Sequence, residues 1–466
     1  MSLYQEPLAW DQSVIDRYDL SGPRYTSYPT APQFREDFSG KEWRAAVARS
    51  NAEGQPLSLY FHIPFCDTLC FYCACNKIVT HKRSRAQPYL ECMEREMAMQ
   101  AELFENRPVA QLHWGGGTPT YISDEEMSWL MAATRRHFQL LDDDQGEYSI
   151  EVHPGRVSAA TMGHLRGLGF NRVSMGVQDF NPRVQDAVNR YNSVEQVRDL
   201  VNAVRDQGYH SISMDLIYGL PMQTRDSVAE TLEQVIELSP DRLSLFNYAH
   251  LPHLFKSQRL IDEANLPAPQ EKLAILHAAI ERLQSAGYVY VGMDHFAKPD
   301  DSLVLAQQQG KLQRNFQGYS THGDCELIAF GVSAISHYGG TYIQNAKKVE
   351  DYQARIDNDQ PAFIRGVALH PEDYLRREVI NQLICHFQLS FCDLHEKFGI
   401  DPASYFADEL AELKPMEEDG LLEVTPAGIF VKNSGRLLIR RVCMVFDQYL
   451  HNGMQTGNQI RYSKVI

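Results

Sequence analysis

Four cysteines lie within ten residues of one another, and their spacing is the first sign of chemistry in this chain. Cys66, Cys70 and Cys73 form a C-x3-C-x2-C pattern, and Cys75 follows two residues later. In a reducing compartment such a cluster indicates a metal, an iron–sulfur cluster or redox chemistry. Structural zinc needs four ligands, for which Cys75 is the available fourth thiol. Three cysteines on a four-iron cluster would instead leave one iron open to another molecule.

The elements that must position these cysteines follow a repeating βα pattern. Six short runs rich in β-forming residues are each followed by a stretch long enough for a crossover helix, and this succession predicts an α/β fold with a parallel sheet. Thr224–Leu238 is the clearest helix, with apolar residues at three- and four-residue spacing. The expected strands are Leu57–Ile63, Gln111–Trp114, Tyr148–Val152, Arg172–Val177, Ser211–Ile217 and Arg242–Asn247.

Polar groups and glycines gather where these strands end. Gly115-Gly116-Gly117, Glu151, Gln178 and Asp215 each end or follow a different strand. Contributions from several strands favour a full or partial barrel, whose carboxyl rim carries the chemistry, over an open sheet with one switch point. Glycine lets a backbone approach a ligand closely, carboxylates accept from ribose hydroxyls or an ammonium group, and Arg190 suits a carboxylate.

The pattern changes past residue 361. Three helices and a β-hairpin are typical of a winged-helix-like module, and Arg436, Arg440 and Arg441 are compatible with DNA binding. The acidic chain favours a small cap on the barrel instead. The expected helices are Pro371–Phe387, Ser390–Phe398, Ala403–Leu413 and Gly435–Leu450, with a hairpin at Gly420–Val424 and Gly428–Val431.

Composition excludes several classes of protein. The chain has 466 residues with 44 Lys and Arg against 60 Asp and Glu, a formal charge of −16 that argues against a nucleic-acid partner. No uncharged apolar run approaches about 18 residues, and the first residues have no signal-peptide pattern, so a soluble, cytoplasmic protein is expected. The other five cysteines, Cys92, Cys325, Cys385, Cys392 and Cys443, are expected to be small buried hydrophobic residues.

Longer motifs extend the reading of the cysteine loop. They are PRYTSYPT at 23–30, YFHIPFC at 60–66, CACNKIVT at 73–80, HWGGGTP at 113–119, NRVSMGVQDF at 171–180, DLIYGLP at 215–221, NYAH at 247–250, MDHF at 293–296 and NFQGY at 315–319. With C-x3-C-x2-C, the chain resembles the radical S-adenosylmethionine (SAM) superfamily. From about Ser21 to Ile466 it resembles the oxygen-independent coproporphyrinogen III oxidase (dehydrogenase) family. Ala74 and His153 depart from the family pattern, but neither removes a required chemical group.

The resemblance implies a partial (β/α)6-type barrel over residues 36–365. An N-terminal segment, 1–35, would lie over the active site, and residues 366–466 would form the mostly helical, winged-helix-like C-terminal domain. Cys66, Cys70 and Cys73 would hold one [4Fe–4S] cluster, with Tyr72 at its edge. Cys75 is not counted as a ligand, because a fourth thiolate would close the open iron; a supporting role or a buried inert thiol both stay open.

The resemblance also implies two SAM molecules. The first would touch Tyr60, Gly116, Glu151 and Ile335, and the second Gly117, Thr118, Gln178, Arg190, Asp215 and Ala249. The implied reaction is the anaerobic oxidative decarboxylation of two propionates, on rings A and B of coproporphyrinogen III, to vinyl groups. A 5′-deoxyadenosyl radical would start it, and the product would be protoporphyrinogen IX, in haem biosynthesis.

The implied partners are an external flavodoxin- or ferredoxin-like electron donor and an unidentified electron acceptor, with a monomeric enzyme and no membrane. Because the substrate carries four carboxylates and the chain is acidic, local cations must focus the field at the entrance. The candidates are Arg24, Lys77, Lys298 and Arg314. His295 and Tyr319 lie in motif segments and are further candidates for substrate contact, while Arg24, Tyr25 and Tyr28 are expected to help close over it.

Three other functions compete with this one. A related radical SAM enzyme could act on another tetrapyrrole, for example as a haem-degrading methyltransferase. A haem chaperone could keep the cluster without turnover, although Arg190 and Asp215 would then have no second cofactor to bind. A regulator could use the C-terminal module to bind DNA with the cluster as sensor, and a steep salt dependence would reveal it.

Overall fold

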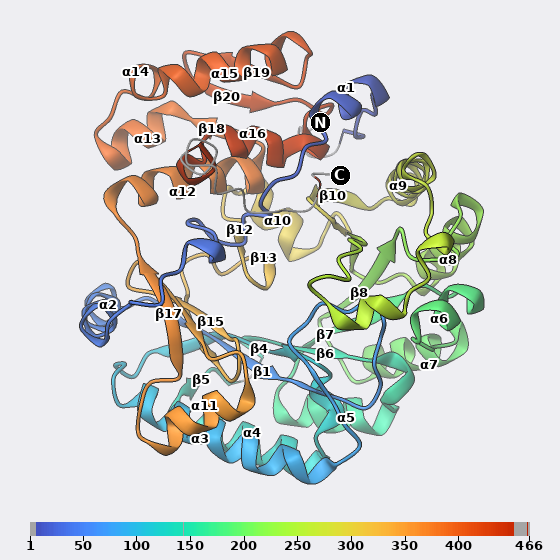
Figure 1. Ribbon diagram of the computed structural model, residues 1–466, viewed down its shortest axis with the longest axis vertical. Coiled ribbons are helices and arrows are strands. Elements are labelled where there is room, and N and C mark those ends of the chain that lie inside the picture. Colours follow the sequence, from blue (N-terminus) through green and yellow to red (C-terminus); the bar gives the residue numbers. More distant parts are fainter. Residues whose placement is uncertain (1–5, 143, 452–463, 465–466) are drawn as a thin grey trace. The chain divides into compact units, whose positions relative to one another are not determined.

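The computed structural model describes residues 6–142, 144–451 and 464 (Figure 1), and within them the chain forms two compact units. The sheet unit comprises Arg35–Arg282 and Asp324–Ala368. The terminal unit comprises the described residues of Met1–Phe34, Leu283–Gly323 and Leu369–Ile466. Residues 283–323, which the sequence-based boundaries assign to the barrel, thus group with the two ends of the chain.

The sheet unit is built on parallel strands, as the βα pattern predicts. Neighbouring strands run in the order β9-β8-β7-β6-β4-β1-β14, all parallel, and β5 pairs with β4. Each predicted strand is present with ends shifted by at most three residues. The bounds are β1 Leu57–Ile63, β4 Pro108–Gly116, β5 Gln139–Leu140, β6 Glu147–Val152, β7 Arg172–Gln178, β8 Ser211–Tyr218, β9 Arg242–Asn247 and β14 Glu326–Phe330.

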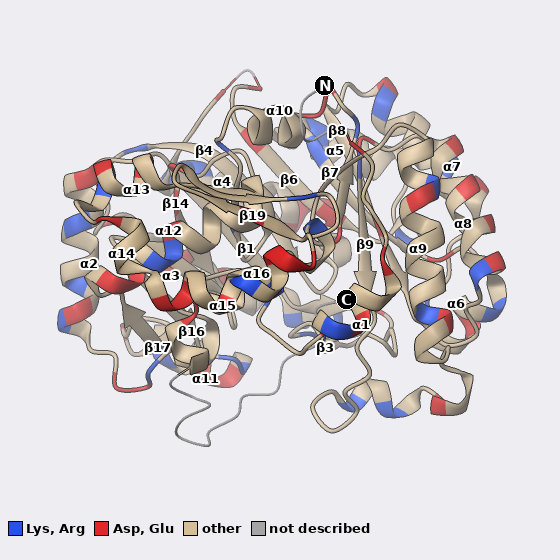
Figure 2. Cartoon of the chain, turned by 90° about the horizontal axis from the view of Figure 1, so that it is seen from above, with Lys and Arg blue, Asp and Glu red and all other residues tan. Residues whose placement is uncertain are grey.

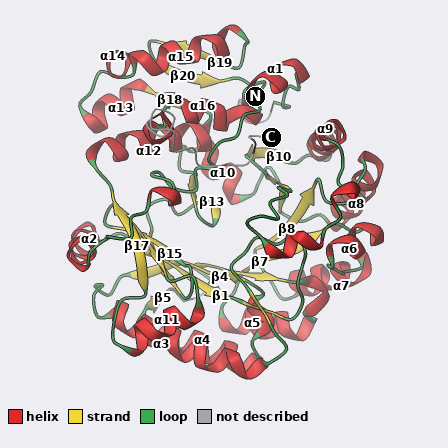
Figure 3. Ribbon diagram, in the orientation of Figure 1, coloured by secondary structure: helices red, strands yellow, loops and turns green. Residues whose placement is uncertain are grey.

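Helices cover one face of this sheet (Figures 1 and 3). Several begin with a reciprocal cap in which a hydroxyl accepts from the backbone three residues on: Ser123 starts α4, Ser193 starts α7 and Thr224 starts α8. The helices are α3 Ala86–Ala101, α4 Asp124–His137, α5 Ala159–Leu168, α6 Pro182–Val188, α7 Val194–Asp206, α8 Arg225–Leu238 and α9 Pro269–Ser285, whose last residues belong to the terminal unit.

Aromatic packing forms the core of the sheet unit. Trp114 is fully buried, with its ring 4.9 Å from Phe170 and 6.2 Å from Phe61. Phe330 links β14 to the same cluster, 5.1 Å from Phe61 and 5.6 Å from Phe138. Burying large rings contributes much of the apolar area that stabilises a domain, so this cluster holds the strands at fixed register.

An antiparallel extension completes the sheet. Strands β15 Ile335–Tyr338, β16 Thr341–Asn345 and β17 Phe363–Ala368 follow β14 in order, each antiparallel to its neighbour. Helix α2, Gly40–Glu53, packs on β15, and α11, Val349–Asp357, packs on α3.

The terminal unit contains the predicted winged-helix-like module. A three-stranded antiparallel sheet, β18-β20-β19, stands beside the helices. The elements are α1 Gln12–Tyr18, β10 Val289–Gly292, β11 His295–Ala297, α10 Ser302–Gln308, β12 Gln313–Asn315, β13 Gly318–Ser320, α12 Pro371–His386, β18 Gln388–Ser390, α13 Phe391–Phe398, α14 Pro402–Tyr405, α15 Ala407–Glu418, β19 Leu422–Thr425, β20 Gly428–Val431 and α16 Ile439–Val445.

The last predicted helix is shorter than its apolar pattern indicates. Helix α16 ends at Val445 rather than Leu450, because Asp447 leaves the helix and caps the residues that follow. Its carboxylate accepts from the backbone N–H groups of Tyr449 and Leu450, at 3.0 and 3.3 Å. An aspartate that satisfies exposed N–H groups ends one helix and begins the next turn.

The N-terminal motif lies inside the terminal unit. Tyr25 and Tyr28 are 4 % and 1 % exposed, and the Tyr25 hydroxyl donates to Asp447 at 3.0 Å. Arg440 is 2 % exposed and donates to the carbonyls of Gly22 and Pro23, the latter at 2.9 Å. The two tyrosines are therefore anchors of this segment rather than exposed contact residues.

The three arginines that are compatible with DNA binding have other roles. Besides Arg440, Arg436 is 2 % exposed with its guanidinium over the Phe387 ring at 4.6 Å, and Arg441 pairs with Glu412 at 3.2 Å. Buried or paired guanidinium groups cannot line a phosphate backbone.

Acidic and basic residues mix along outer helices such as α2 and α6 (Figure 2). Among the described residues, no helix is both long and apolar enough to span a bilayer.

Candidate active site

A cavity of about 290 Å³ opens at the carboxyl ends of the parallel strands of the sheet unit. Convergence at this edge is what the strand-end pattern predicts. Eleven residues expected from the sequence to bind cofactor line it: Cys66, Cys70, Tyr72, Cys73, Gly116, Gly117, Thr118, Glu151, Gln178, Arg190 and Asp215. Cys75 and Lys77 line it as well.

The cysteine loop is fixed at both ends by backbone hydrogen bonds. Cys66 ends a short strand, β2 Phe65–Cys66, which pairs in parallel with β3 Ile78–Val79, and the Thr80 N–H donates to the Cys66 carbonyl at 3.0 Å. In the middle of the loop, Phe71 and Tyr72 pack on an apolar cluster in the same unit. The loop is therefore held by packing as well as by its ends.

The thiols differ in their electrostatic environment. Burial raises the pKa of Cys66 to about 11, although the Thr118 hydroxyl, 3.5 Å from its sulfur, opposes the shift. A hydrogen bond from Cys75, together with the charge of Lys77, lowers the pKa of Cys73 to about 6. Among the described residues, no group of three His, Cys, Asp or Glu surrounds a single ion position. A four-iron cluster does not require one, because each thiolate takes a different iron.

Glycines give the backbone room beside the cysteine loop. Gly116 has a φ of +115°, and a Cβ there would lie 2.8 Å from the His62 ring. A Cβ at Gly117 would lie 2.6 Å from the Pro64 carbonyl oxygen. A side chain at either position would collide with its neighbour, so glycine is required for this approach.

Glu151 sits at the centre of a polar network. It accepts from the Gly116 N–H at 3.2 Å, and His113 Nε2 lies 3.2 Å from its other oxygen. The Ser149 hydroxyl lies 2.6 Å from His113 Nδ1, and because an ionised carboxylate only accepts, His113 Nε2 is the donor to Glu151. Burial favours the neutral acid, but these hydrogen bonds outweigh it and lower the pKa of Glu151. Its side chain stays 44 % accessible because it faces the cavity.

Asp215 has the opposite character. Burial and the nearby charge of Glu151 raise the pKa of Asp215 to about 6, despite a hydrogen bond from Ser174 Oγ at 3.0 Å. The two carboxyl groups that face the cavity thus have different pKa values. Glu151 stays ionised and accepts hydrogen bonds, whereas Asp215 can gain a proton near neutral pH.

Arg190 and Gln178 also line the cavity. The Arg190 guanidinium donates to the Gly176 carbonyl and lies 3.7 Å from the Cys70 sulfur. Gln178 has a φ of +69°, a rare conformation for a residue with a side chain, of the kind that accumulates at functional sites. A Cβ at Gly176 would lie 2.8 Å from both side chains, so this glycine lets them meet.

Three predicted cofactor contacts do not line the cavity. Tyr60 stacks on His113, with the two ring centroids 5.8 Å apart, and so contacts the histidine that donates to Glu151. Ala249 accepts from the Gln258 side chain at 3.2 Å through its carbonyl, and Ile335 of β15 pairs with Gln344 of β16. Their predicted contacts with SAM stay predictions.

Two histidines have contacts that the sequence did not predict: His62 lies beside Gly116, and His153 lines the cavity. His62 donates from Nε2 to the Asn76 carbonyl at 2.8 Å and takes the Tyr60 hydroxyl on Nδ1 at 3.0 Å. Burial and the charges of Arg190 and Arg156 lower the pKa of His153 to about 2, so the ring is neutral. The signal was alternation, because every second residue of a strand faces the same side.

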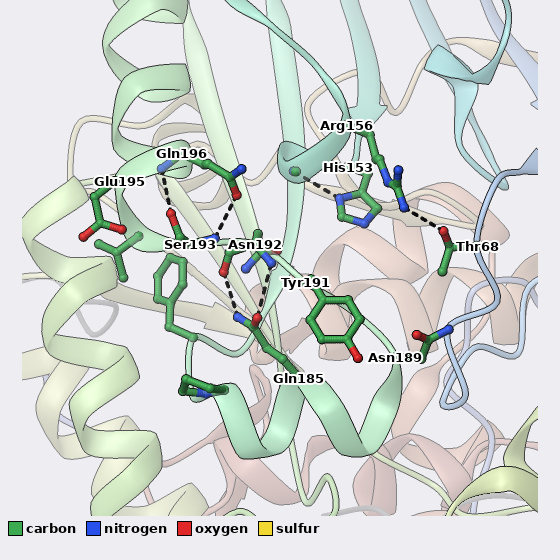
Figure 4. Close-up of a pocket in the computed structure, with 14 residues that line it drawn as sticks. Thr68, His153, Arg156, Gln185, Asn189, Tyr191, Asn192, Ser193, Glu195 and Gln196 are labelled. Atoms are coloured by element: carbon green, nitrogen blue, oxygen red, sulfur yellow. Dashed lines mark hydrogen bonds between the residues drawn. The ribbon is translucent and has the colours of Figure 1, made fainter.

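A second hollow adjoins the cavity. This side pocket, of about 510 Å³, shares Thr68, His153 and Arg156 with the cavity (Figure 4). Arg156 donates to the Thr68 hydroxyl at 2.9 Å. The wall between the hollows is therefore part of the cysteine loop and the turn after β6.

The remaining cysteines follow the sequence expectation in part. Cys92, Cys385 and Cys443 are buried, as predicted. Cys325 is only half-buried and Cys392 is exposed, because α13 turns Cys392 outward, where its thiol lies 3.6 Å from Glu396.

The residues present fit an iron–sulfur cluster with a polar ligand. Three thiols reach one cavity from a single loop, which is the donor set such a cluster requires. Gln178 Oε1 and Arg190 Nε are buried without a hydrogen-bond partner among the described residues. Buried polar atoms normally have partners, so a polar ligand in the cavity would satisfy them.

Comparison with known proteins agrees with this geometry. The model of the radical SAM superfamily matches residues 60–235, and that of the HemN C-terminal domain matches residues 369–438. Oxygen-independent coproporphyrinogen III oxidase from Pseudomonas aeruginosa is 52 % identical over 99 % of this chain and 100 % of its own length. The protein of the same name from Escherichia coli K12 is 50 % identical over the whole of both chains.

A solved structure supports the same assignment. Coproporphyrinogen III oxidase (HemN) from Escherichia coli, described as a radical SAM enzyme, has a TM-score of 0.91 and 49 % identity, covering 96 % of this chain and 100 % of its own. The predicted α/β barrel with its helical C-terminal domain is thereby confirmed. Full-length identity of this degree shows that the chain belongs to the oxygen-independent coproporphyrinogen III oxidase family of the radical SAM superfamily.

Proposed function

We propose that this protein converts the two propionate side chains on rings A and B of coproporphyrinogen III to vinyl groups without oxygen, giving protoporphyrinogen IX. The observation that carries the proposal is the cavity lined by three thiols and by Glu151, Asp215 and Arg190, in a chain similar over its full length to enzymes of that name. Each conversion releases carbon dioxide, one hydrogen atom and one electron.

Radical SAM enzymes use a [4Fe–4S] cluster and SAM. Cys66, Cys70 and Cys73 would hold the cluster, with Cys75 left free of it. When bound, the two groups supply a carbon radical able to remove hydrogen from the β-carbon of a propionate. The fold's contribution is to orient the reacting groups and to keep water out of the cavity.

The wall residues suit the polar groups of SAM. Glu151 stays ionised through its bonds from His113 and Gly116, so it can accept from an ammonium group or a ribose diol. Arg190 offers an unpartnered Nε to a carboxylate. Two SAM molecules are part of the proposal, one on the side of Gly116 and Glu151 and one beside Gln178, Arg190 and Asp215.

Binding of a tetracarboxylate requires cations. Lys77 lines the cavity, where it donates to the Cys73 carbonyl at 2.8 Å. In the terminal unit, Arg314 stacks over Tyr319 at 4.8 Å, and its Nη1 is buried without a hydrogen-bond partner among the described residues. Arg24 is bound to Asp294. We propose Lys77 as the first candidate for propionate binding in the cavity, because its ammonium group retains capacity to donate; a role for Arg314 in binding substrate stays a prediction.

The remaining parts of the proposal concern the setting of the reaction. The segment 1–35 would lie over the active site, an external one-electron carrier would reduce the cluster, and a separate acceptor would take the electron released by decarboxylation. A cytoplasmic monomer is the expected form. Nine free cysteines fit a reducing compartment, and sedimentation equilibrium would test the monomer.

The test is an anaerobic assay of the reconstituted protein with SAM, dithionite and coproporphyrinogen III. The expected result is divinyl product together with 5′-deoxyadenosine. Glu151→Gln should lower the yields of divinyl product and of 5′-deoxyadenosine at least tenfold, because it removes the negative charge to which His113 and the Gly116 N–H donate. Glu125→Gln, at an exposed residue in the first turn of α4, is the matched control and should match the native protein.

Two outcomes would contradict the proposal. Deoxyadenosine without vinyl product would indicate a relative acting on another tetrapyrrole. Haem binding without SAM cleavage would indicate a chaperone.

A further inference from the structure

The loop that holds the cysteines continues into a stretch with an unusual charge. Between Thr68 and Leu90 there is no Asp or Glu, while Lys77, Lys82, Arg83 and Arg85 all lie there. The chain as a whole carries −16. A run of positive charge in an acidic protein creates a local field that favours an anionic partner. We call residues 77–85 the basic loop.

Backbone and side-chain contacts join the basic loop directly to the cysteine loop. The Thr80 N–H donates to the carbonyl of Cys66, and Arg83 pairs with Asp67, the next residue, at 2.8 Å. Arg85 is five positions after Thr80, so with consecutive Cα atoms about 3.8 Å apart every Cα of the basic loop lies within about 19 Å of the Thr80 Cα.

The outer part of the basic loop is open to a partner. Residues 81–85 are all exposed. Within the described residues, neither the Lys82 ammonium nor the Arg85 guanidinium forms an ion pair. Arg83 is partly neutralised by Asp67 and lies over the Tyr121 ring at 4.0 Å. Arg156, from the turn after β6, is also exposed and donates to Thr68, the neighbour of Asp67 (Figure 4).

Carboxylates near this surface do not cancel its charge. Asp67 is already paired with Arg83. Glu126 faces Tyr121, but its carboxylate accepts the backbone N–H of Ser123 in the cap of α4. Against these two carboxylates stand the five cations Lys77, Lys82, Arg83, Arg85 and Arg156, so the charge of this surface stays positive.

We propose that the basic loop is the docking surface for a small acidic protein that carries one electron. This inference rests on the proposed function, because a cluster on Cys66, Cys70 and Cys73 must receive an electron from outside. One electron leaves the reduced carrier and enters the metal centre; no bond forms and no proton moves. Positive charge beside the cysteine loop brings an acidic carrier to the part of the surface nearest the cavity, which raises the association rate.

The test uses the reconstituted holoprotein and a purified acidic bacterial flavodoxin. The variant Lys82→Glu/Arg85→Glu reverses two charges that have no ion-pair partner to lose. The matched control, Lys41→Glu/Arg44→Glu, makes the same change in net charge at two exposed residues of α2, which packs on β15. Flavodoxin affinity is measured by calorimetry at two salt concentrations, and cluster reduction by reduced flavodoxin is followed by stopped-flow absorbance.

Lys82→Glu/Arg85→Glu should lower the affinity and the second-order reduction rate at least tenfold at low salt, and the difference should shrink at high salt. The control should change either quantity less than twofold. Lys82→Gln/Arg85→Gln should fall between them, and dithionite should reduce the cluster equally in all variants, which shows that the site is intact.

Equal losses in the test and control variants would show that net charge alone acts, and would overturn the proposal. No loss in either would place docking elsewhere and overturn it too. Failure of the proposed function is separate, because the native protein would then form no vinyl product with dithionite, whatever flavodoxin binding showed.

Discussion

The buried carboxyl group of Glu96 makes the free energy of unfolding depend on pH, which allows a quantitative test of the packing in the sheet unit. This carboxyl group on α3 is 2 % exposed and accepts from the Gly331 N–H at 2.9 Å and from Asn345 Nδ2 at 2.7 Å, with the Tyr352 hydroxyl 2.6 Å away. Burial raises the pKa of Glu96 to about 7, and the three hydrogen bonds only partly oppose the shift. The native protein therefore binds a proton at Glu96 more tightly than the unfolded chain does.

The sign and size of the effect follow from that difference. Between the ordinary pKa of about 4.5 and the folded value of about 7, the native state holds more protons, so the free energy of unfolding falls as the pH rises. A difference of one pKa unit corresponds to about 1.4 kcal/mol. The difference between the folded and ordinary pKa values of Glu96 therefore contributes about 3 kcal/mol to the free energy of unfolding. This stability is fully present below pH 4.5 and is lost by the time the pH exceeds 7.

The substitution Glu96→Gln replaces the group by a neutral amide of the same shape. Urea unfolding followed by tryptophan fluorescence at pH 5 and pH 8 should show the native protein losing about 2 to 3 kcal/mol more than the variant does. Glu91→Gln, at an exposed residue of the same helix, is the control and should keep the native pH dependence. If Glu96→Gln kept the native slope, the carboxyl would be ionised in the folded state and the reasoning would be refuted.

Three further predictions concern the site. Cys66→Ser should abolish iron–sulfur absorbance after reconstitution, whereas the exposed Cys392→Ser should keep it. Gly117→Ala should cost about 1 to 3 kcal/mol of stability in urea unfolding, since its Cβ would meet a carbonyl oxygen at 2.6 Å. SAM binding measured by equilibrium dialysis should weaken below about pH 6 as Asp215 gains a proton, and Asp215→Asn should remove that pH dependence. An unchanged absorbance, midpoint or pH profile, respectively, would contradict them.

Strands were the most predictable part of the fold. A strand such as Ser211–Ile217 alternates apolar Ile212, Met214 and Leu216 with polar residues, and this two-residue period is recognised without tertiary information. The helix at Gly435–Leu450 was overestimated for the converse reason. Its apolar spacing continues past Val445, but the Asp447 carboxylate caps a new turn. The helix therefore ends where the cap forms, although the apolar pattern continues.

The site was predictable where one residue type carries the chemistry and not where geometry does. Cysteine spacing and a glycine triplet are visible in sequence. His113 is not, because its role depends on Glu151 in the neighbouring strand at 3.2 Å, a pairing set by the register of β4 against β6. The same holds for His62, whose ring meets Gly116 only because β1 lies beside β4.

Buried charge in the terminal unit limits how the N-terminal segment can move. A guanidinium as buried as Arg440 is stable only while carbonyl groups satisfy it, and Gly22 and Pro23 supply two of them. Tyr25 adds a bond to the buried Asp447. Pulling the segment away alone would remove two carbonyl partners from a buried guanidinium and one hydroxyl donor from a buried carboxylate, at a total cost of several kcal/mol. Any closure over substrate therefore has to carry the winged-helix-like module along with the segment.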